Sequence, residues 1–270
     1  MSKHHKYLII GGGMTADAAV QGIREIDSEG SIGLIGAEVD RPYNRPPLTK
    51  GLWKGDQFES IWRKATEANA ELYLGRTVKT LDLWRRQVSD EHGEAFTFEK
   101  LLLATGGTPR LLPFGGDDVI YYRTVRDYSR VRDLTQKGNR FAVIGGGFIG
   151  SEIAAALALN HKEVVMLFPG AGIGDRMFPR DLSFSLNRYY EEHGVEVQTG
   201  TRVTRVDRRG EKLVIETETH GKYVPVRAHP RTLASPRASA CGLSPGLCST
   251  GPSGRKGFFI QNVQSPGGGL

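Results

Sequence analysis

The sequence has little cysteine and no long apolar run. Its 270 residues include only two cysteines, Cys241 and Cys248, which form neither a C-x-x-C nor a C-x-x-x-x-C pair. Two such cysteines predict no disulfide framework, no dithiol redox centre and no metal site. No apolar run approaches the length of a transmembrane helix, and the opening residues MSKHHKY lack the apolar core of a secretion signal. We therefore expect a cytoplasmic protein with no membrane attachment.

Acidic residues are also absent after Glu218, and this absence explains the charge of the chain. There are 36 lysines and arginines against 30 aspartates and glutamates, a net charge of +6. Six of the basic residues follow Glu218, so the rest of the chain is neutral and has no net charge to draw it to nucleic acid. A nucleic-acid-binding tail is an alternative, which the scattered charges and few aromatic residues of this region disfavour.

The tail, residues 224–270, differs in composition from the rest of the chain. Residues 221–270 hold 9 glycines, 6 prolines and 6 serines and show no sustained periodicity. Such a segment buries too little apolar surface to offset the entropy that is lost on ordering. We expect most of the tail to be disordered, with residues 256–264, KGFFIQNVQ, as its only candidate strand.

One pattern is present twice in the remaining sequence. An apolar strand, a glycine turn, a small-residue helix and a second buried strand occupy residues 7–36 and recur at residues 140–168. Two parallel strands joined by a helix form a βαβ unit, which is almost always right-handed. The pattern predicts an α/β fold with two dinucleotide-binding, Rossmann-like domains, which we expect at residues 1–122 and 123–223.

The first glycine motif, Gly11-x-Gly13-x-x-Ala16, follows a strand and opens a helix. The first glycine allows a tight turn, the second lets backbone N–H groups approach a pyrophosphate, and the small third residue lets the helix pack on the strand. Glu38 stands just past the second strand, where an acid binds a ribose hydroxyl. A tight strand-to-helix turn without a ligand is the alternative.

The second motif, Gly145-x-Gly147-x-x-Gly150, has the complete glycine triplet. Its second strand ends in Phe168-Pro169-Gly170 without an acid, so the motif does not predict whether NADH or NADPH is preferred. Arg176 is either a candidate for binding a 2′-phosphate or simply an exposed arginine. Two dinucleotide sites in one chain suggest a bound prosthetic group and a diffusing reductant, for which FAD and NAD(P)H are the usual pair.

Further motifs carry a resemblance to a known family. RPYNRPPLTKGL, residues 41–52, resembles the signature of the FAD-dependent pyridine nucleotide-disulphide oxidoreductases, in the branch of ferredoxin and rubredoxin reductases and apoptosis-inducing-factor-like proteins. Residues 103–110, LATGGTPR, resemble the second FAD motif of this family, and residues 145–154 resemble its NAD(P)H motif. The resemblance covers about residues 6–223.

The resemblance implies which residues bind the two cofactors. FAD would be bound by Gly11, Gly13, Ala16 and Glu38 at its ADP part, the backbone of Val78 at its adenine, Ala104, Thr105 and Gly106 of the second motif, and Arg45, Lys50 and Arg110 near the isoalloxazine. NAD(P)H would be bound by Gly145, Gly147, Phe148, Ile149, Gly150 and Glu152. Lys50 and Glu152 would form a catalytic pair, in which the lysine favours negative charge on the reduced flavin and the carboxylate positions the lysine. A solvated lysine and a surface glutamate are the alternatives.

The resemblance also implies a reaction. NAD(P)H would pass hydride to FAD, and the absence of a dithiol leaves a ferredoxin- or rubredoxin-like protein, a quinone, a dye or oxygen as the acceptor. Past Val224, the family's Gly-x-Gly-x-x-Pro strand, its Tyr-Ala-x-Gly-Asp motif and its C-terminal domain are not recognisable, and a frameshift near residue 224 is our hypothesis. We then expect an FAD domain without its last strand and an incomplete NAD(P)H domain with an exposed sheet edge. The alternative function is an impaired remnant that binds nucleotide weakly or not at all.

Overall fold

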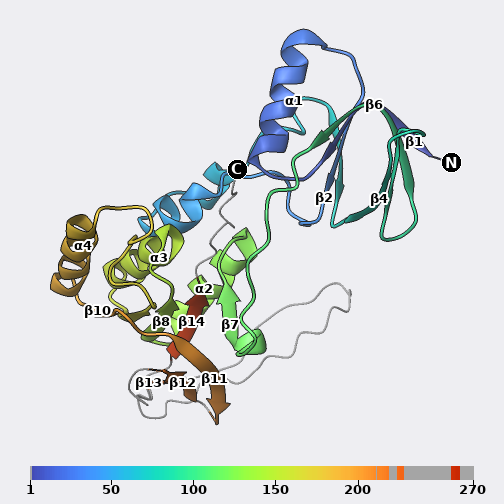
Figure 1. Cartoon of the computed structure of the whole chain (residues 1–270). Coiled ribbons are helices and arrows are strands. Elements are labelled where there is room, and N and C mark those ends of the chain that lie inside the picture. Colours follow the sequence, from blue (N-terminus) through green and yellow to red (C-terminus); the bar gives the residue numbers. More distant parts are fainter. Residues whose placement is uncertain (1, 211, 219–223, 228–256, 262–270) are drawn as a thin grey trace, which may run out of the picture. The chain divides into compact units, whose positions relative to one another are not determined.

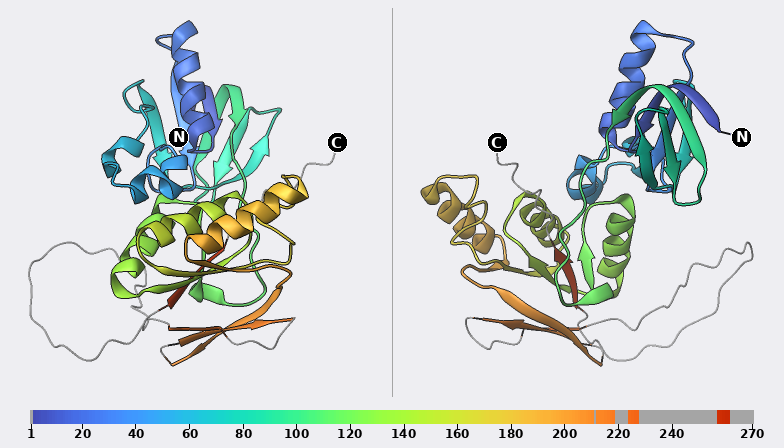
Figure 2. Two further views of the ribbon diagram at one scale, coloured as in Figure 1. Left: turned by 90° about the vertical axis from the view of Figure 1, so that its left-hand side faces the viewer. Right: turned by 45° about the vertical axis from the view of Figure 1, so that its right-hand side comes forward.

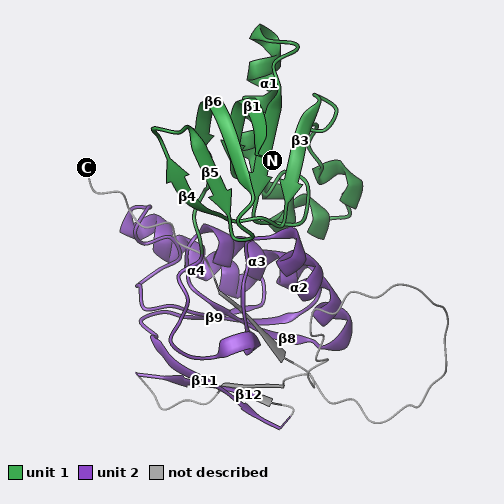
Figure 3. Ribbon diagram, turned by 90° about the vertical axis from the view of Figure 1, so that its right-hand side faces the viewer, with its two compact units in different colours: residues 1–108 green, residues 109–270 purple. Residues whose placement is uncertain are grey.

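The computed structural model describes residues 2–210, 212–218, 224–227 and 257–261 (Figure 1). The chain divides into two compact units, Met1–Thr108 and Pro109–Leu270 (Figure 3). This division lies before the expected boundary at residue 122, because strand β7, Val119–Tyr121, pairs within the sheet of the second unit.

The first unit is built on a six-stranded sheet with the strand order β3-β2-β1-β6-β5-β4. Strands β3, β2, β1 and β6 run parallel to their neighbours, whereas β5 pairs antiparallel with both β6 and β4. Helix α1 connects β1 to β2, which completes the first βαβ unit. The elements are β1 (Lys3–Ile10), α1 (Met14–Ile26), β2 (Ile32–Gly36), the 3-10 turns η1 (Pro46–Thr49), η2 (Gly51–Trp53) and η3 (Phe58–Ile61), β3 (Ala70–Leu74), β4 (Val78–Asp82), β5 (Gln87–Asp90) and β6 (Ala95–Leu103).

Both faces of this sheet are covered, which is why its parallel strands read as continuous apolar runs. On one face, Ile9 belongs to a buried cluster with Ala16 and Val20 of α1. On the other face, Leu8 belongs to a second buried cluster that includes Phe96 of β6. The first glycine turn is therefore anchored in a packed core on both sides of β1.

The second unit contains a five-stranded parallel sheet with the strand order β10-β9-β8-β14-β7. A three-stranded antiparallel sheet, β11-β12-β13, belongs to the same unit. The predicted α/β fold with two Rossmann-like units is thus confirmed. The elements are η4 (Gly116–Asp118), β7 (Val119–Tyr121), α2 (Val125–Lys137), β8 (Arg140–Ile144), α3 (Phe148–Leu159), β9 (Glu163–Leu167), α4 (Arg180–Glu192), β10 (Val195–Gln198), β11 (Val203–Arg209), β12 (Lys212–Thr217), β13 (Val224–Arg227) and β14 (Gly257–Gln261).

The tail contributes a strand to the middle of this sheet, which corrects one expectation. Strand β14 lies between β8 and β7, and Ile260 is in register with Val143 on one side and Ile120 on the other (Figure 2). The expected loss of a closing strand, with an exposed sheet edge, is therefore wrong. Residues 257–261 fill this place because their backbone can hydrogen-bond to two neighbours at once. The tail also begins with a strand, β13, so the expectation that residues 256–264 hold its only strand is wrong. The disorder expected for residues 228–256 and 262–270 concerns residues outside the described part of the chain.

Strand β6 of the first unit is paired on both sides only over its first half. It pairs with β1 as far as Leu103, but its pairing with β5 covers only Ala95 to Thr97, followed by a hydrogen bond from Phe98. Within the described ranges, no strand pairs with the β5 side of β6 after this point. The expectation that the domain lacks its last strand stays a prediction.

Candidate functional site

The first glycine turn brings the two predicted FAD motifs into contact. The N–H of Gly11 donates to the carbonyl of Ile35 at 2.8 Å, and the N–H of Ala104 donates to the carbonyl of Ile10 at 2.7 Å. Gly11 has a φ of +126°, and a Cβ atom on it would lie 2.0 Å from the carbonyl oxygen of Ala104. Only glycine fits here, because the turn is wedged between the ends of β2 and β6.

Gly13 is a different case, because the protein itself does not require a glycine at this position. A Cβ atom on Gly13 would meet no protein atom within 4 Å, and its φ of −94° is open to any residue. Gly13 is the N-cap of α1, and no side chain caps this helix end. Uncapped N–H groups beside open space fit the approach of a pyrophosphate, so the residues present suit the dinucleotide that the motif predicts.

Glu38 is held by two side chains of the segment that follows β2. Its Oε2 accepts a hydrogen bond from the Tyr43 hydroxyl at 2.5 Å, and its Oε1 forms an ion pair with Arg45. Arg45 also donates to the Tyr43 hydroxyl at 3.0 Å. All three groups are partly or fully buried. Arg45, which we expected near the isoalloxazine, is thus bonded to the residue that we expected at the adenosine ribose.

An arginine that sequence reasoning did not select connects this segment to α1. The Nε of Arg63 donates to the buried carboxylate of Asp17 at 2.5 Å, and its Nη1 donates to Asn44 at 2.6 Å. Asp17 lies in the first turn of α1, so the guanidinium fixes residues 41–50 beside the helix end. A single arginine far from a motif gives no spacing signal, and only the folded chain reveals its role.

Lys50 stands between two 3-10 turns whose apolar residues are buried. Leu48, Leu52 and Trp53 are each at most 5% exposed, and the indole N–H of Trp53 donates to the carbonyl of Leu48 at 2.8 Å. Lys50 itself is exposed. The packed turns therefore hold the backbone of Lys50 while its side chain extends outward. Glu152 belongs to the second unit, so the expected pair with Lys50 stays a prediction.

Three further expected FAD residues lie near the ends of strands in the first unit. Val78 opens β4 and packs against the cluster around Leu8. Thr105 and Gly106 follow β6 and are exposed, and Gly106 has a φ of +67°. Arg110, expected near the isoalloxazine, belongs to the second unit and lines a cavity there.

The second glycine turn repeats the geometry of the first. Gly145 has a φ of +119°, and its N–H donates to the carbonyl of Leu167 at the end of β9 at 2.9 Å. Gly147 is the N-cap of α3, which also lacks a side-chain cap, and Gly150 is buried in the first turn of that helix. A second helix N-terminus is thus available to a phosphate.

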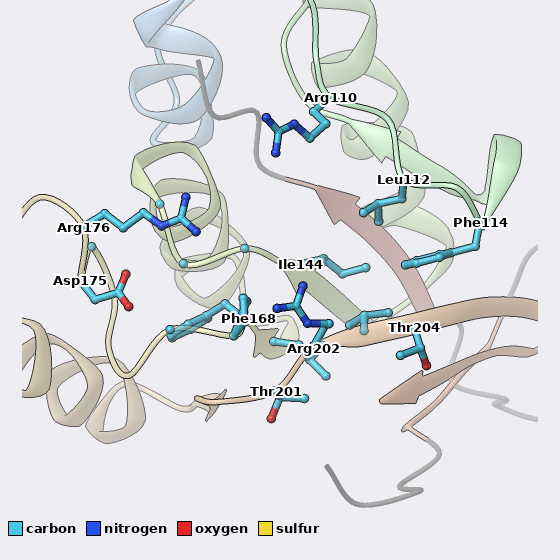
Figure 4. A pocket seen from close by; sticks show the side chains of 18 of the residues that line it. Arg110, Leu112, Phe114, Ile144, Phe168, Asp175, Arg176, Thr201, Arg202 and Thr204 are labelled. Carbon is cyan, nitrogen blue, oxygen red and sulfur yellow. The ribbon is translucent and has the colours of Figure 1, made fainter. Parts of the chain in front are cut away.

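A cavity of about 720 Å³ lies beside this turn (Figure 4). It is lined by the glycine turn at 145–147, the end of β9 at 167–170, the loop at 174–177 and residues 201–204. Its volume is in the range of pockets that bind small molecules and cofactors. The cavity and the turn together match a nucleotide site contained in the second unit.

The first turns of α3 carry the remaining expected NAD(P)H residues. Phe148 is 55% exposed and contacts Phe178 edge to face, with ring centroids 5.9 Å apart. Ile149 and Glu152 are partly exposed. The hydroxyl of Tyr190, from α4, donates to the carbonyl of Ser151 at 3.1 Å. Burial raises the pKa of Tyr190, and the Glu152 carboxylate adds to this rise.

The described residues contain no group of three or more metal-ligating side chains that could hold an ion. Within those same ranges, none of the helices combines the length and the apolar character that a bilayer crossing demands.

Comparisons with known proteins agree with this geometry. A family model described as pyridine nucleotide-disulphide oxidoreductase matches residues 5–228. Apoptosis-inducing factor 1, mitochondrial, of Dictyostelium discoideum is 35% identical over 228 residues, which are 74% of this chain and 43% of that protein. Putidaredoxin reductase CamA of Pseudomonas putida is 32% identical over 75% of this chain and 51% of its own length.

Solved structures show the same likeness. The covalent putidaredoxin reductase–putidaredoxin complex matches 82% of this chain and 56% of the solved chain, with a TM-score of 0.74 and 31% identity. A ferredoxin reductase of the CYP199A2 system from Rhodopseudomonas palustris matches 83% and 57%, with a TM-score of 0.75 and 26% identity. The chain spans about half the length of the curated relatives that it matches.

Proposed function

Because the chain belongs to the pyridine nucleotide-disulphide oxidoreductase family, we propose that it acts as a flavin oxidoreductase that transfers hydride from NAD(P)H to FAD. The observation that carries this proposal is the pair of glycine turns, each of which leads into a helix without a side-chain cap. Each turn follows the first strand of its own βαβ unit, which is where such folds bind dinucleotides.

The first unit would hold FAD, which supplies a ring that accepts hydride. The uncapped N–H groups of α1 and the open side of Gly13 suit its pyrophosphate. Glu38 would accept hydrogen bonds from the ribose hydroxyls, with Arg45 holding its carboxylate in place. Val78 would contact the adenine through its backbone, and Ala104, Thr105 and Gly106 would line the opposite wall of the turn.

The second unit would hold NAD(P)H in the cavity beside Gly145 and Gly147. The first turn of α3, with Phe148, Ile149 and Gly150, would bind its pyrophosphate and flank the nicotinamide end. Arg110 lines the same cavity, and a guanidinium there suits a phosphate.

Lys50 and Glu152 would serve the hydride step without exchanging a proton with the substrate. A lysine ammonium near the flavin favours the negative charge that hydride brings to the ring. A carboxylate bonded to the ammonium would hold it in one orientation. The Lys50–Glu152 pair is part of the proposed function. We also propose that the protein is located in the cytoplasm.

The electron acceptor would be a separate molecule, because the sequence contains no closely spaced cysteine pair in either nucleotide-binding region. A ferredoxin- or rubredoxin-like protein is the acceptor that we favour, since a relative is named putidaredoxin reductase and has been crystallised with putidaredoxin. A quinone, a dye or oxygen would serve as a substitute in an assay.

The first test is a visible spectrum of the purified full chain, before and after NADH is added without oxygen. We expect a flavin absorbance, either as purified or after addition of FAD, that bleaches with NADH and returns with an oxidised dye. Protein without NADH is the control. A chain that stays colourless when FAD is added would contradict the proposal and support an impaired remnant instead.

A further inference from the structure

The end of β9 is where a dinucleotide-binding fold supplies an acid for the adenosine ribose. A carboxylate at this point accepts a hydrogen bond from the 2′-hydroxyl of NAD, whereas NADP carries a phosphate there. In this chain β9 ends at Leu167 and is followed by Phe168, Pro169 and Gly170. The expected position therefore carries no acid of its own.

A carboxylate from another part of the chain stands at this position. A Cβ atom on Gly170 would lie 2.0 Å from Oδ2 of Asp175 and 2.9 Å from its Oδ1. The Asp175 carboxylate thus fills the space where a side chain at 170 would begin, and Asp175 lines the cavity beside the second glycine turn (Figure 4). Gly170 and Asp175 together place an acid where the fold normally has one.

The loop that carries Asp175 is bonded to the glycine turn. The N–H of Gly174 donates to the carbonyl of Gly146 at 2.8 Å, and Gly174 has a φ of +71°. The N–H of Ala171 donates to Oδ2 of Asp175 at 3.1 Å. These bonds tie the carboxylate to the same turn that would bind the pyrophosphate.

Helix α4 holds the loop from its other side. The side chain of Asn187 accepts a hydrogen bond from the N–H of Ile173 at 2.9 Å and donates to the carbonyl of Ala171 at 3.1 Å. A Cβ atom on Gly172 would lie 2.7 Å from that of Ser183, so the loop passes close against the helix. The position of Asp175 therefore depends on packing rather than on a freely moving loop.

We propose that Asp175 selects NADH over NADPH by accepting hydrogen bonds from the adenosine ribose hydroxyls. The inference rests on the proposed function of this cavity as the NAD(P)H site. A carboxylate already bonded to one backbone N–H still has lone pairs for hydroxyl donors. The same charge repels a 2′-phosphate, so one residue both favours one nucleotide and disfavours the other.

Three arginines line the same cavity, Arg110, Arg176 and Arg202, and the last two set the competing outcome. Arg202 lies 3.3 Å from the carboxylate of Glu218, which compensates part of its charge. Arg176 directly follows Asp175 and also reaches toward the cavity (Figure 4). If these arginines dominated, the chain would bind the 2′-phosphate of NADPH more tightly than NADH.

Fluorescence titrations of the full chain with NADH and with NADPH test the proposal through binding alone. We expect the wild-type chain to bind NADH more tightly than NADPH. Two variants, Asp175→Asn and Asp175→Ala, should each weaken NADH binding about tenfold, equivalent to ~1.4 kcal/mol. In Asp175→Asn the amide oxygen can still accept the hydrogen bond from the N–H of Ala171. Both variants should leave NADPH binding unchanged or stronger.

Asp181→Ala is the matched control, because it removes one charge from the nearby first turn of α4 at a residue that does not line this cavity. Its two affinities should equal those of the wild-type chain. Circular dichroism of each variant would verify that it is folded. Equal effects of Asp175 and Asp181 substitutions, or a wild-type preference for NADPH, would overturn the role of Asp175 while leaving a nucleotide site. A wild-type chain that binds neither nucleotide would overturn the proposed function and this inference together.

Discussion

Single glycines in the first turn serve two separable purposes. Gly11 is required by the protein, since its φ is positive and the carbonyl of Ala104 occupies the place of a side chain. Gly13 has an ordinary φ and open space around it, so its lack of a side chain makes sense only for something that approaches from outside. The same motif thus contains one position that serves folding and one that serves binding.

This difference predicts opposite results for two alanine variants. Gly11→Ala should lower the free energy of unfolding of the first unit by about 2 kcal/mol or more, because of strain and a backbone clash. Gly13→Ala should cost less than about 1 kcal/mol, the size of an N-cap effect, yet should weaken FAD binding strongly. Urea unfolding of the FAD-free chain and titration with FAD would measure the two effects. Unimpaired FAD binding by Gly13→Ala would contradict the assignment.

At the scale of elements, a buried contact spans three strands of the first sheet. The ring of His5 on β1 lies over Gly33 of β2, where a Cβ atom would be 2.6 Å from the ring. Its Nε2 lies 3.1 Å from the hydroxyl of Tyr73 on β3, and that hydroxyl donates to Glu71. The Nε2–H of His5 is therefore the donor, and its Nδ1 is left as a buried acceptor without a partner.

Burial lowers the pKa of His5 below its ordinary value. The carboxylate of Glu71 opposes this shift, and the positive charges of His4 and Lys3 add to it. The unfolded chain then binds a proton at this histidine as the pH falls through about 6.5, before the folded chain does. We expect the free energy of unfolding to fall between about pH 7 and 5.5, by at most ~1.4 kcal/mol per pH unit.

Urea unfolding at several pH values, with His5→Gln as the test variant, would measure this dependence. The variant should lose most of the decline over that range, because it has no imidazole to protonate. His92→Gln is the matched control, because it removes an exposed imidazole of the same unit that is not among the groups that shift the pKa of His5. An unchanged pH dependence in His5→Gln would show that other groups cause the decline.

At the scale of the whole molecule, a strand near the end of the chain belongs to the sheet of the second unit. Residues 257–261 lie between β8 and β7, so both of these strands depend on β14 for backbone hydrogen bonds. The family match itself ends at residue 228. A part of the chain outside the recognised family region is therefore integral to the sheet that carries the second glycine turn.

Two truncations would separate the strand from the rest of the tail. A chain that ends after residue 228 lacks β14 and should have a second unit that unfolds at lower temperature and is cleaved faster by protease, since β8 and β7 lose their shared neighbour. A chain that ends after residue 261 keeps β14 and should match the full chain. Thermal unfolding by circular dichroism and limited proteolysis would measure both. Equal stability of the two truncations would contradict a structural role for β14.

Local patterns made much of this architecture predictable. Both βαβ units follow from periodicity and turn chemistry within about thirty residues, and the turns at Gly11 and Gly145 have the positive φ that such turns require. Apolar character near residues 256–264 likewise marked a candidate strand. These features depend on residues that are close together in the sequence, so the local pattern alone is enough to predict them.

Contacts that do not follow from a local strand, helix or turn pattern could not be predicted in this way. The position of β14 between β8 and β7, the ion pair of Glu38 with Arg45, and the bond of Arg63 to Asp17 all join residues that no periodicity connects. Asp175 reaches Gly170 only because α4 and the glycine turn hold the loop between them. Such placements depend on packing across the whole unit, and so they are decided only when the chain is folded.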